Sequence, residues 1–217
     1  MPDPLLPPLS SFVLTAEEES AINLALSTAK PWKHDSTELK EIRNTLVGLK
    51  NRIRDFHLLR QSSKCCYCRM NLYGGGDFII DREHIVPKEQ FKILTYVISN
   101  LSVACKRCNM QLKKKDISFL INPDSILAKH AEADQYRFIH PNYEKYSSFI
   151  KKISYELDDS TYVKYTKLDH AKASFTYDYF ELRELEVNSF DHAQGIAVKD
   201  EAGTIRERLA QEIAATS

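Results

Sequence analysis

The chain has 217 residues, which is enough to bury a hydrophobic core without help from a partner. Hydrophobic residues make up 43% and charged residues 28%, as in ordinary globular proteins, and the formal net charge of zero excludes a uniformly basic surface. No apolar run approaches the roughly 20 residues that a membrane helix needs, and the proline-rich start lacks the basic residues of a signal peptide. We therefore expect a cytoplasmic protein that engages no membrane and whose cysteines bind metal rather than form disulfides.

Charge is unevenly distributed along the chain. Residues 61–120 contain ten Lys and Arg against five Asp and Glu, whereas residues 156–217 contain seven against thirteen. The basic region predicts phosphate binding at one local site. The acidic end fits either a basic partner or an ordinary solvated surface.

The sequence pattern over residues 1–60 predicts an N-terminal helical extension. It begins with a proline-rich arm that is expected either to be mobile or to pack on a neighbouring segment. Thr15 and Glu18 form a capping-box pattern, which predicts a helix to about Thr28. Apolar residues then recur at steps of three and four over residues 36–57, the period of one helical face. This amphipathic helix is expected to pack on the central part of the chain, with a dimer or partner contact as the alternative.

The sequence pattern over residues 121–217 predicts a C-terminal helical region that includes a β-hairpin. Apolar residues alternate over residues 153–157 and less regularly over residues 162–165, with a turn between them. Residues 170–187 and 200–214 are expected to be helical.

Two C-x-x-C pairs give the strongest local signal. At this spacing two thiolates of one tight turn reach the same ion, and two such turns make a closed tetrahedral site of the kind that structural zinc prefers. A redox pair or buried thiols would not require two matched pairs. The predicted zinc ligands are Cys65, Cys68, Cys105 and Cys108, which leaves Cys66 as a packing residue.

An acid–histidine pair lies between the two cysteine pairs. Phe78–Ile80 reads as a short strand that leads into Asp81, Arg82, Glu83 and His84. Since the reference pKa of histidine is ~6.5, His84 offers a neutral imidazole that can take a proton from water. Adjacent residues of a strand face opposite sides, so a shared site for Glu83 and His84 requires a bend.

An asparagine and several cations follow the second cysteine pair. Asn109 stands where a helix should begin, and its amide oxygen could bind a Mg²⁺ ion together with Glu83. Lysine and arginine side chains near this site are expected to neutralise the phosphates of nucleic acid. These are Arg82, Lys88, Lys106, Arg107, Lys113, Lys114 and Lys115.

The central stretch resembles the HNH (ββα-metal) endonuclease superfamily. The matching residues are Glu83–Pro87, Asn100–Leu101 and Cys105–Asn109, together with the bracketing cysteine pairs of its zinc-containing members. The resemblance covers residues 61–120. It implies two antiparallel strands and a helix around one catalytic Mg²⁺ or Mn²⁺ ion.

By position, the resemblance implies roles for four residues. His84 would be the general base, Glu83 and Asn109 would hold the catalytic ion, and Asn100 would brace the loop and orient His84. The family more often has Asp directly before the histidine, so Asp81 is the second candidate for the acidic ligand.

The expected fold is therefore α+β, a mostly helical chain around a central ββα-metal module with a four-cysteine zinc site. The expected function is hydrolysis of DNA phosphodiester bonds. A looser resemblance to PtuB-like nuclease subunits of Septu and retron anti-phage defence systems implies an ATPase partner, and self-association is also compatible with the sequence. The alternatives are a stand-alone restriction-type nuclease and a zinc-knuckle protein that binds nucleic acid without cleaving it.

Overall fold

The computed structural model describes residues 3–158 and 160–188, and these fall into two compact units. The first unit comprises residues 3–152 and 165–184, and the second contains residues 153–158, 160–164 and 185–188. The α+β class is confirmed, but the expectation of a mostly helical chain is wrong, because helices cover less than half of the described residues. The predicted helix at residues 200–214 lies outside them. No helix in the described part is long and apolar enough to cross a bilayer.

Long connections with only short helical turns account for much of the difference. Helices α3 (Gly76–Ile79) and α4 (Ile126–Lys129) are single turns. The 3-10 turns are Leu9–Ser11, Thr37–Leu39, Lys92–Leu94, Ile98–Asn100, Pro123–Ser125, Ala133–Gln135, Tyr146–Ser148 and Leu182–Leu185.

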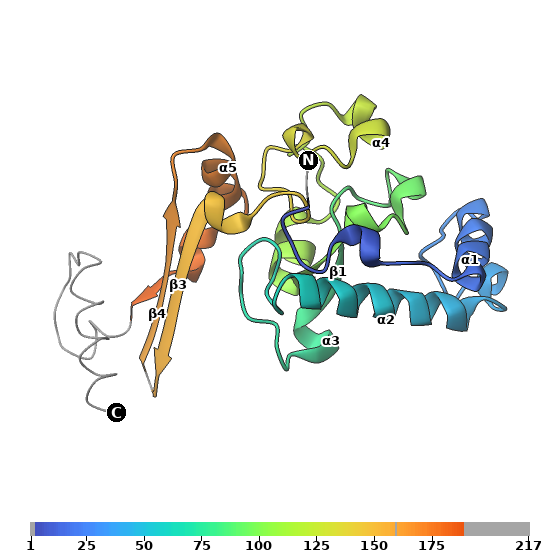
Figure 1. The fold of residues 1–217 in the computed structure, drawn as a ribbon, viewed down its shortest axis with the longest axis horizontal. Helices are drawn as coiled ribbons and strands as arrows, with labels where there is room; N and C mark the ends of the chain where they lie inside the picture. The colour runs from blue at the N-terminus through green and yellow to red at the C-terminus, as the bar shows by residue number, and fades with distance from the viewer. Residues whose placement is uncertain (1–2, 159, 189–217) are drawn as a thin grey trace. The chain divides into compact units, whose positions relative to one another are not determined.

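The two longer N-terminal helices, α1 (Ala16–Ser27) and α2 (Arg43–Arg60), lie side by side (Figure 1). The predicted start of α1 is confirmed, because the Thr15 hydroxyl accepts from the Glu18 N–H while the Glu18 carboxylate accepts from the Thr15 N–H. Helix α2 begins later than predicted, since a 3-10 turn precedes it, and it continues three residues past residue 57.

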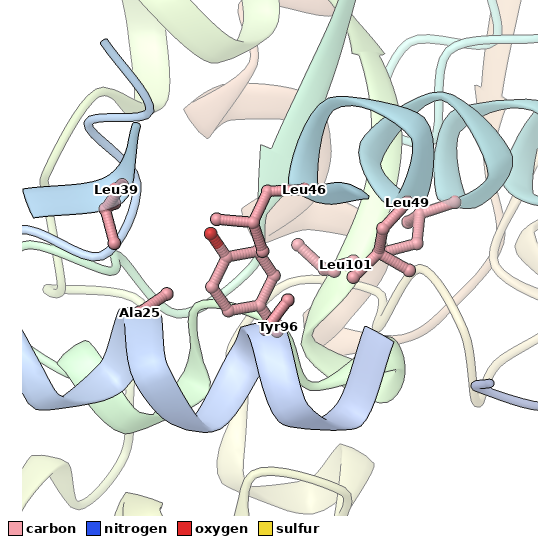
Figure 2. Close-up of a cluster of buried hydrophobic side chains, with 8 residues drawn as sticks. Ala25, Leu39, Leu46, Leu49, Tyr96 and Leu101 are labelled. Atoms are coloured by element: carbon pink, nitrogen blue, oxygen red, sulfur yellow. The ribbon is translucent and has the colours of Figure 1, made fainter. Parts of the chain in front are cut away.

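The apolar stripe of α2 is buried against the centre of the chain, as predicted. Leu46 and Leu49 pack against Tyr96 and Leu101, with Ala25 of α1 closing the cluster (Figure 2). The Tyr96 hydroxyl, buried in this cluster, donates to a backbone carbonyl oxygen 2.8 Å away, so its burial leaves no polar group unsatisfied. This core fixes α2 beside β2 (Leu101–Cys105).

Strands β1 (Ile80–His84) and β2 form a two-stranded antiparallel sheet, with Ile80 opposite Cys105 and His84 opposite Leu101. The strand predicted at residues 78–80 overlaps β1 only at Ile80, because residues 76–79 form the helical turn α3. The predicted helix after the second cysteine pair is η5 (Arg107–Lys113), which is a π-helix. Two strands and a helical segment thus share the central region.

The second sheet has the order β3-β4-β5, formed by β3 (Ile150–Leu157), β4 (Ser160–Lys167) and β5 (Val187–Asn188). The predicted hairpin is confirmed by the neighbouring strands β3 and β4. The helix predicted over residues 170–187 is shorter, since α5 ends at Tyr179 (Ala171–Tyr179).

The proline-rich arm is fastened to the end of α2. The Arg60 guanidinium, whose side chain is fully buried, forms two hydrogen bonds of 2.9 and 3.0 Å with the Asp3 carboxylate and also donates to the Pro7 carbonyl oxygen. Its charged group stacks on the Phe56 ring at 5.6 Å. The arm therefore closes one end of the N-terminal region.

Candidate metal centre and adjoining cavity

The four predicted cysteine ligands converge. A tight turn carries the first pair: the Arg69 N–H donates to the Cys65 carbonyl oxygen, and this turn brings Cys68 back toward Cys65. Cys105 ends β2 and Cys108 lies in the first turn of η5. All four sulfur atoms lie within 4.8 Å of one another, and all four residues are buried.

This sulfur cluster could hold a zinc ion. Burial raises the pKa of the Cys65 thiol, but hydrogen bonds from four neighbouring cysteines together outweigh burial and hold that pKa well below its usual value. Hydrogen bonds with Cys105 instead raise the pKa of the Cys68 and Cys108 thiols, so the four sulfur atoms share their protons unequally. A closed set of four sulfur ligands is what structural zinc prefers. Cys66 stands outside the cluster, and burial raises the pKa of its thiol, so it remains protonated and packs in the core.

Glu83 is completely buried on one side of β1. Its Oε1 accepts from the Tyr67 hydroxyl at 2.9 Å and lies 2.8 Å from the Lys113 ammonium. Burial raises the pKa of the Glu83 carboxyl, although the charge of Lys113 opposes that rise. Lys113 is itself only 1% exposed and also donates to the His84 carbonyl oxygen, so its ammonium does not face solvent.

His84 faces the other side of the same strand, because β1 continues through both residues without a bend. Its Nε2 lies 3.0 Å from the Thr95 carbonyl oxygen, a hydrogen bond that places the proton on Nε2 and leaves Nδ1 as the acceptor. Burial, followed by the charge of Lys88, lowers the pKa of His84 well below its usual value. The imidazole is therefore neutral near pH 7. The structure does not bring the Glu83 carboxylate and the His84 ring together.

Asn109 meets Asp81 instead of Glu83. Its Nδ2 donates to Asp81 Oδ2 at 2.7 Å, across the junction of η5 and β1. Both side chains are partly exposed. Asp81, the second candidate for the acidic ligand, is thus the carboxylate beside Asn109.

Asn100 braces the loop that follows His84. Its Oδ1 accepts from the Val86 N–H at 2.8 Å, while its Nδ2 donates to the Val86 and Leu94 carbonyl oxygens at 3.0 and 3.2 Å. Leu94 precedes Thr95, the hydrogen-bond partner of His84. A fully buried amide therefore connects both ends of the loop that positions the imidazole.

The predicted phosphate-binding cations occupy different environments. Lys106, Lys114 and Lys115 are exposed. Arg107 donates to the carbonyl oxygens of Phe180 and Glu181, so it ties η5 to the end of α5.

A cavity of about 110 Å³ lies between α2, β1 and β2. Three cations, one carboxylic acid, one histidine, two aromatic residues, one threonine, one serine and two aliphatic residues line it. The charged residues, the histidine and the tryptophan among them are Lys50, Arg82, Lys88, Asp81, His84 and Trp32. His84 and Asp81 therefore share a cavity with basic side chains.

Comparison with known proteins finds no matching family model, curated protein or solved structure.

Lys50 and Trp32 were not among the residues predicted for the site. Lys50 lies off the apolar stripe of α2, and this position on the helix was the one feature of the sequence that could have indicated a role for Lys50 outside the core. Its approach to His84 depends on the packing of α2 against β2, which no local pattern encodes.

Proposed function

We propose that this chain is a metal-dependent endonuclease of the HNH type that hydrolyses DNA phosphodiester bonds. The observation that carries the proposal is the placement of His84, which shares a cavity with Asp81 and with the cations Arg82 and Lys88. A base, a hard oxygen ligand and phosphate-neutralising charges are the groups that this hydrolysis requires.

His84 would activate the attacking water. The Thr95 carbonyl oxygen holds the proton on Nε2, so Nδ1 can accept the proton that water loses. Since the pKa of His84 is lowered, the accepting nitrogen is unprotonated at neutral pH. Asn100 would keep the imidazole in place through the loop that carries Thr95.

Asp81 and Asn109 would hold the catalytic Mg²⁺ or Mn²⁺ ion. Their carboxylate and amide oxygens are hard ligands of the kind that these ions prefer, and the two side chains are already in contact. Glu83 is less suited, because its carboxylate is completely buried and its Oε1 is already paired with Lys113 and Tyr67, although its Oε2 has no hydrogen-bond partner among the described residues. When bound, the ion would stabilise the negative charge that develops on the phosphate and the leaving oxygen.

The zinc site would have a structural role. Cys65 and Cys68 precede β1, whereas Cys105 and Cys108 join β2 to η5, so an ion held by all four would tie these segments together. It would thereby keep Asn109, which directly follows Cys108, in register with β1.

Substitution of the base tests the proposal. His84→Ala should abolish Mg²⁺- or Mn²⁺-dependent nicking of plasmid and cleavage of single-stranded DNA, while zinc content and thermal unfolding stay as in wild type. His130→Ala is the matched control, because it removes a partly exposed histidine outside the cavity. Cleavage that survives His84→Ala refutes the mechanism. A wild-type protein that binds DNA but cleaves none with any divalent ion is instead a non-catalytic zinc-knuckle protein.

We further propose a role in anti-phage defence, on the basis of the resemblance to PtuB-like nuclease subunits. In that case an ATPase subunit would switch the nuclease on. Activity that appears only when the partner is added supports this role, whereas full activity of the chain alone supports a stand-alone restriction-type enzyme.

A further inference from the structure

Three cations from separate segments meet at the cavity beside His84. Lys50 comes from α2, Arg82 from β1, and Lys88 from the loop after β1. Among the described residues that line the cavity, Asp81 is the one carboxylic acid, while the Asp35 and Glu89 carboxylates lie near enough to act on Lys50 and Lys88. Since His84 is neutral near pH 7, the lining carries an excess of positive charge.

Bringing these charges together is unfavourable in the protein alone. Burial lowers the pKa of Lys50 to about 7, and repulsion by Arg82 and Lys88 adds to that decrease. Burial also lowers the pKa of Lys88. A bound anion would offset both effects, because it supplies the opposite charge at the point where the cations converge.

We propose that Lys50, Arg82 and Lys88 bind a phosphate group of the nucleic-acid backbone in this cavity, so that helix α2 is part of the substrate site. With a volume of about 110 Å³, the cavity has room for several water molecules or for a phosphate group. This inference rests on the proposed nuclease function and adds to it a residue from the N-terminal region.

Two of the three cations make side-chain contacts near the cavity. Asn51, the residue after Lys50 on α2, accepts from Arg82 Nη1 at 3.4 Å. The Lys88 ammonium lies 5.8 Å from the centre of the Trp32 ring, which also lines the cavity. Helix α2 therefore contributes Lys50 to the cavity lining and, through Asn51, accepts a hydrogen bond from Arg82. A phosphate bound there would lie beside His84.

The test measures binding separately from cleavage. Zinc-loaded full-length protein, without Mg²⁺ or Mn²⁺, is titrated into a fluorescent single-stranded DNA oligonucleotide at several KCl concentrations. Lys50→Ala should weaken binding about five- to tenfold and reduce the slope of log affinity against log salt by about 1, as expected for the loss of one phosphate contact. Lys50→Arg should retain most of the affinity. Lys151→Ala, which removes an exposed lysine of β3 outside the cavity, should bind like wild type.

Competition with inorganic phosphate is the second part of the test. It should displace the oligonucleotide from wild-type protein at lower concentrations than potassium chloride of equal ionic strength, and this difference should disappear in Lys50→Ala. Circular dichroism and thermal unfolding establish whether Lys50→Ala is folded. If Lys50→Ala does not fold, Lys50→Met takes its place, because methionine keeps most of the aliphatic part of the lysine side chain.

The outcomes separate this inference from the proposed function. If Lys50→Ala binds DNA with the same affinity and the same salt slope as Lys151→Ala, the proposed phosphate site is wrong, even if the wild-type protein cleaves DNA. Lys50-dependent binding by a wild-type protein that never cleaves overturns the nuclease proposal and leaves the phosphate site standing.

Discussion

The side-chain amide of Asn109 donates a hydrogen bond to the Asp81 carboxylate, with 2.7 Å between Nδ2 and Oδ2. The Glu83 carboxylate, two residues further along the same strand, is buried with Lys113 and Tyr67. The two acidic residues of β1 therefore have different surroundings, and we expect different consequences when each is altered.

Asp81→Asn should reduce Mg²⁺-dependent cleavage about 100-fold or more, because it removes the anionic oxygen proposed to hold the ion. Stability should change little, since Asp81 is only partly buried. Initial rates over a range of Mg²⁺ concentrations, together with denaturant unfolding, provide the measurement. An unchanged rate at every Mg²⁺ concentration would exclude Asp81 as a ligand.

Glu83→Gln should instead lower the free energy of unfolding by about 3 to 5 kcal/mol, because it leaves the Lys113 ammonium buried without its counter-charge. Urea unfolding of the zinc-loaded protein measures this change. The Lys113→Met, Glu83→Gln double variant serves as the control and should recover part of the loss. A Glu83→Gln protein with wild-type stability but without metal-dependent activity would make Glu83 the ligand.

Cys68→Ser should release about one zinc ion per chain and lower the thermal unfolding temperature, since a three-sulfur site binds zinc less tightly than a closed four-sulfur site. Metal analysis and calorimetry test this expectation. Cys66→Ala is the matched control and should keep its zinc, because Cys66 lies outside the cluster. Loss of zinc from both variants would contradict the assigned ligand set.

Asp3→Ala should lower the free energy of unfolding by about 3 kcal/mol, because the fully buried Arg60 side chain then lacks its anionic partner. Asp55→Ala, which affects an exposed pair with Arg54, should cost less than about 1 kcal/mol. Burial raises the pKa of Asp3, but hydrogen bonds from Arg60 and from two backbone N–H groups together outweigh burial and lower that pKa below 3.8. The stabilisation is thus present above that pH and should be lost as pH falls through the lowered pKa. Equal effects of the two substitutions would refute the anchoring of the arm.

Acid should destabilise the protein through its buried histidines. Burial lowers the pKa of His57 and of His140 to about 3, against about 6.5 in the unfolded chain. Stability is therefore complete above pH 6.5 and falls as pH decreases from 6.5 toward 3, by up to about 1.4 kcal/mol per pH unit for each histidine. Guanidinium unfolding at pH 7.5 and 5.5 should show this loss.

His57→Gln isolates one of these contributions. Any release of zinc in acid affects both proteins alike, so the difference between their pH slopes reports on His57. We expect the variant to lose about 1.4 kcal/mol less than wild type between pH 7.5 and 5.5. Parallel slopes would show that His57 does not titrate in this way.

Patterns that depend on residues close together in the chain gave the most accurate predictions. The spacing of the two cysteine pairs identified a cluster that the fold assembles, and the Thr15–Glu18 pattern located the start of α1. Both signals are local, because each depends on residues a few positions apart. The predicted strand at residues 78–80 and the predicted end of the helix after residue 170 were less accurate, since weak local preferences there yield to packing.

The sequence by itself determined which chemical groups are present: four thiols at metal-binding spacing, an imidazole, two nearby carboxylates and an amide. Only the tertiary structure decided which of them meet. The pairing of β1 with β2 and the direction of η5 put Asn109 against Asp81 and Lys113 against Glu83. The packing of α2 likewise brought Lys50 to His84. These contacts join segments that are distant in sequence, so their geometry arises from long-range packing rather than from local pattern.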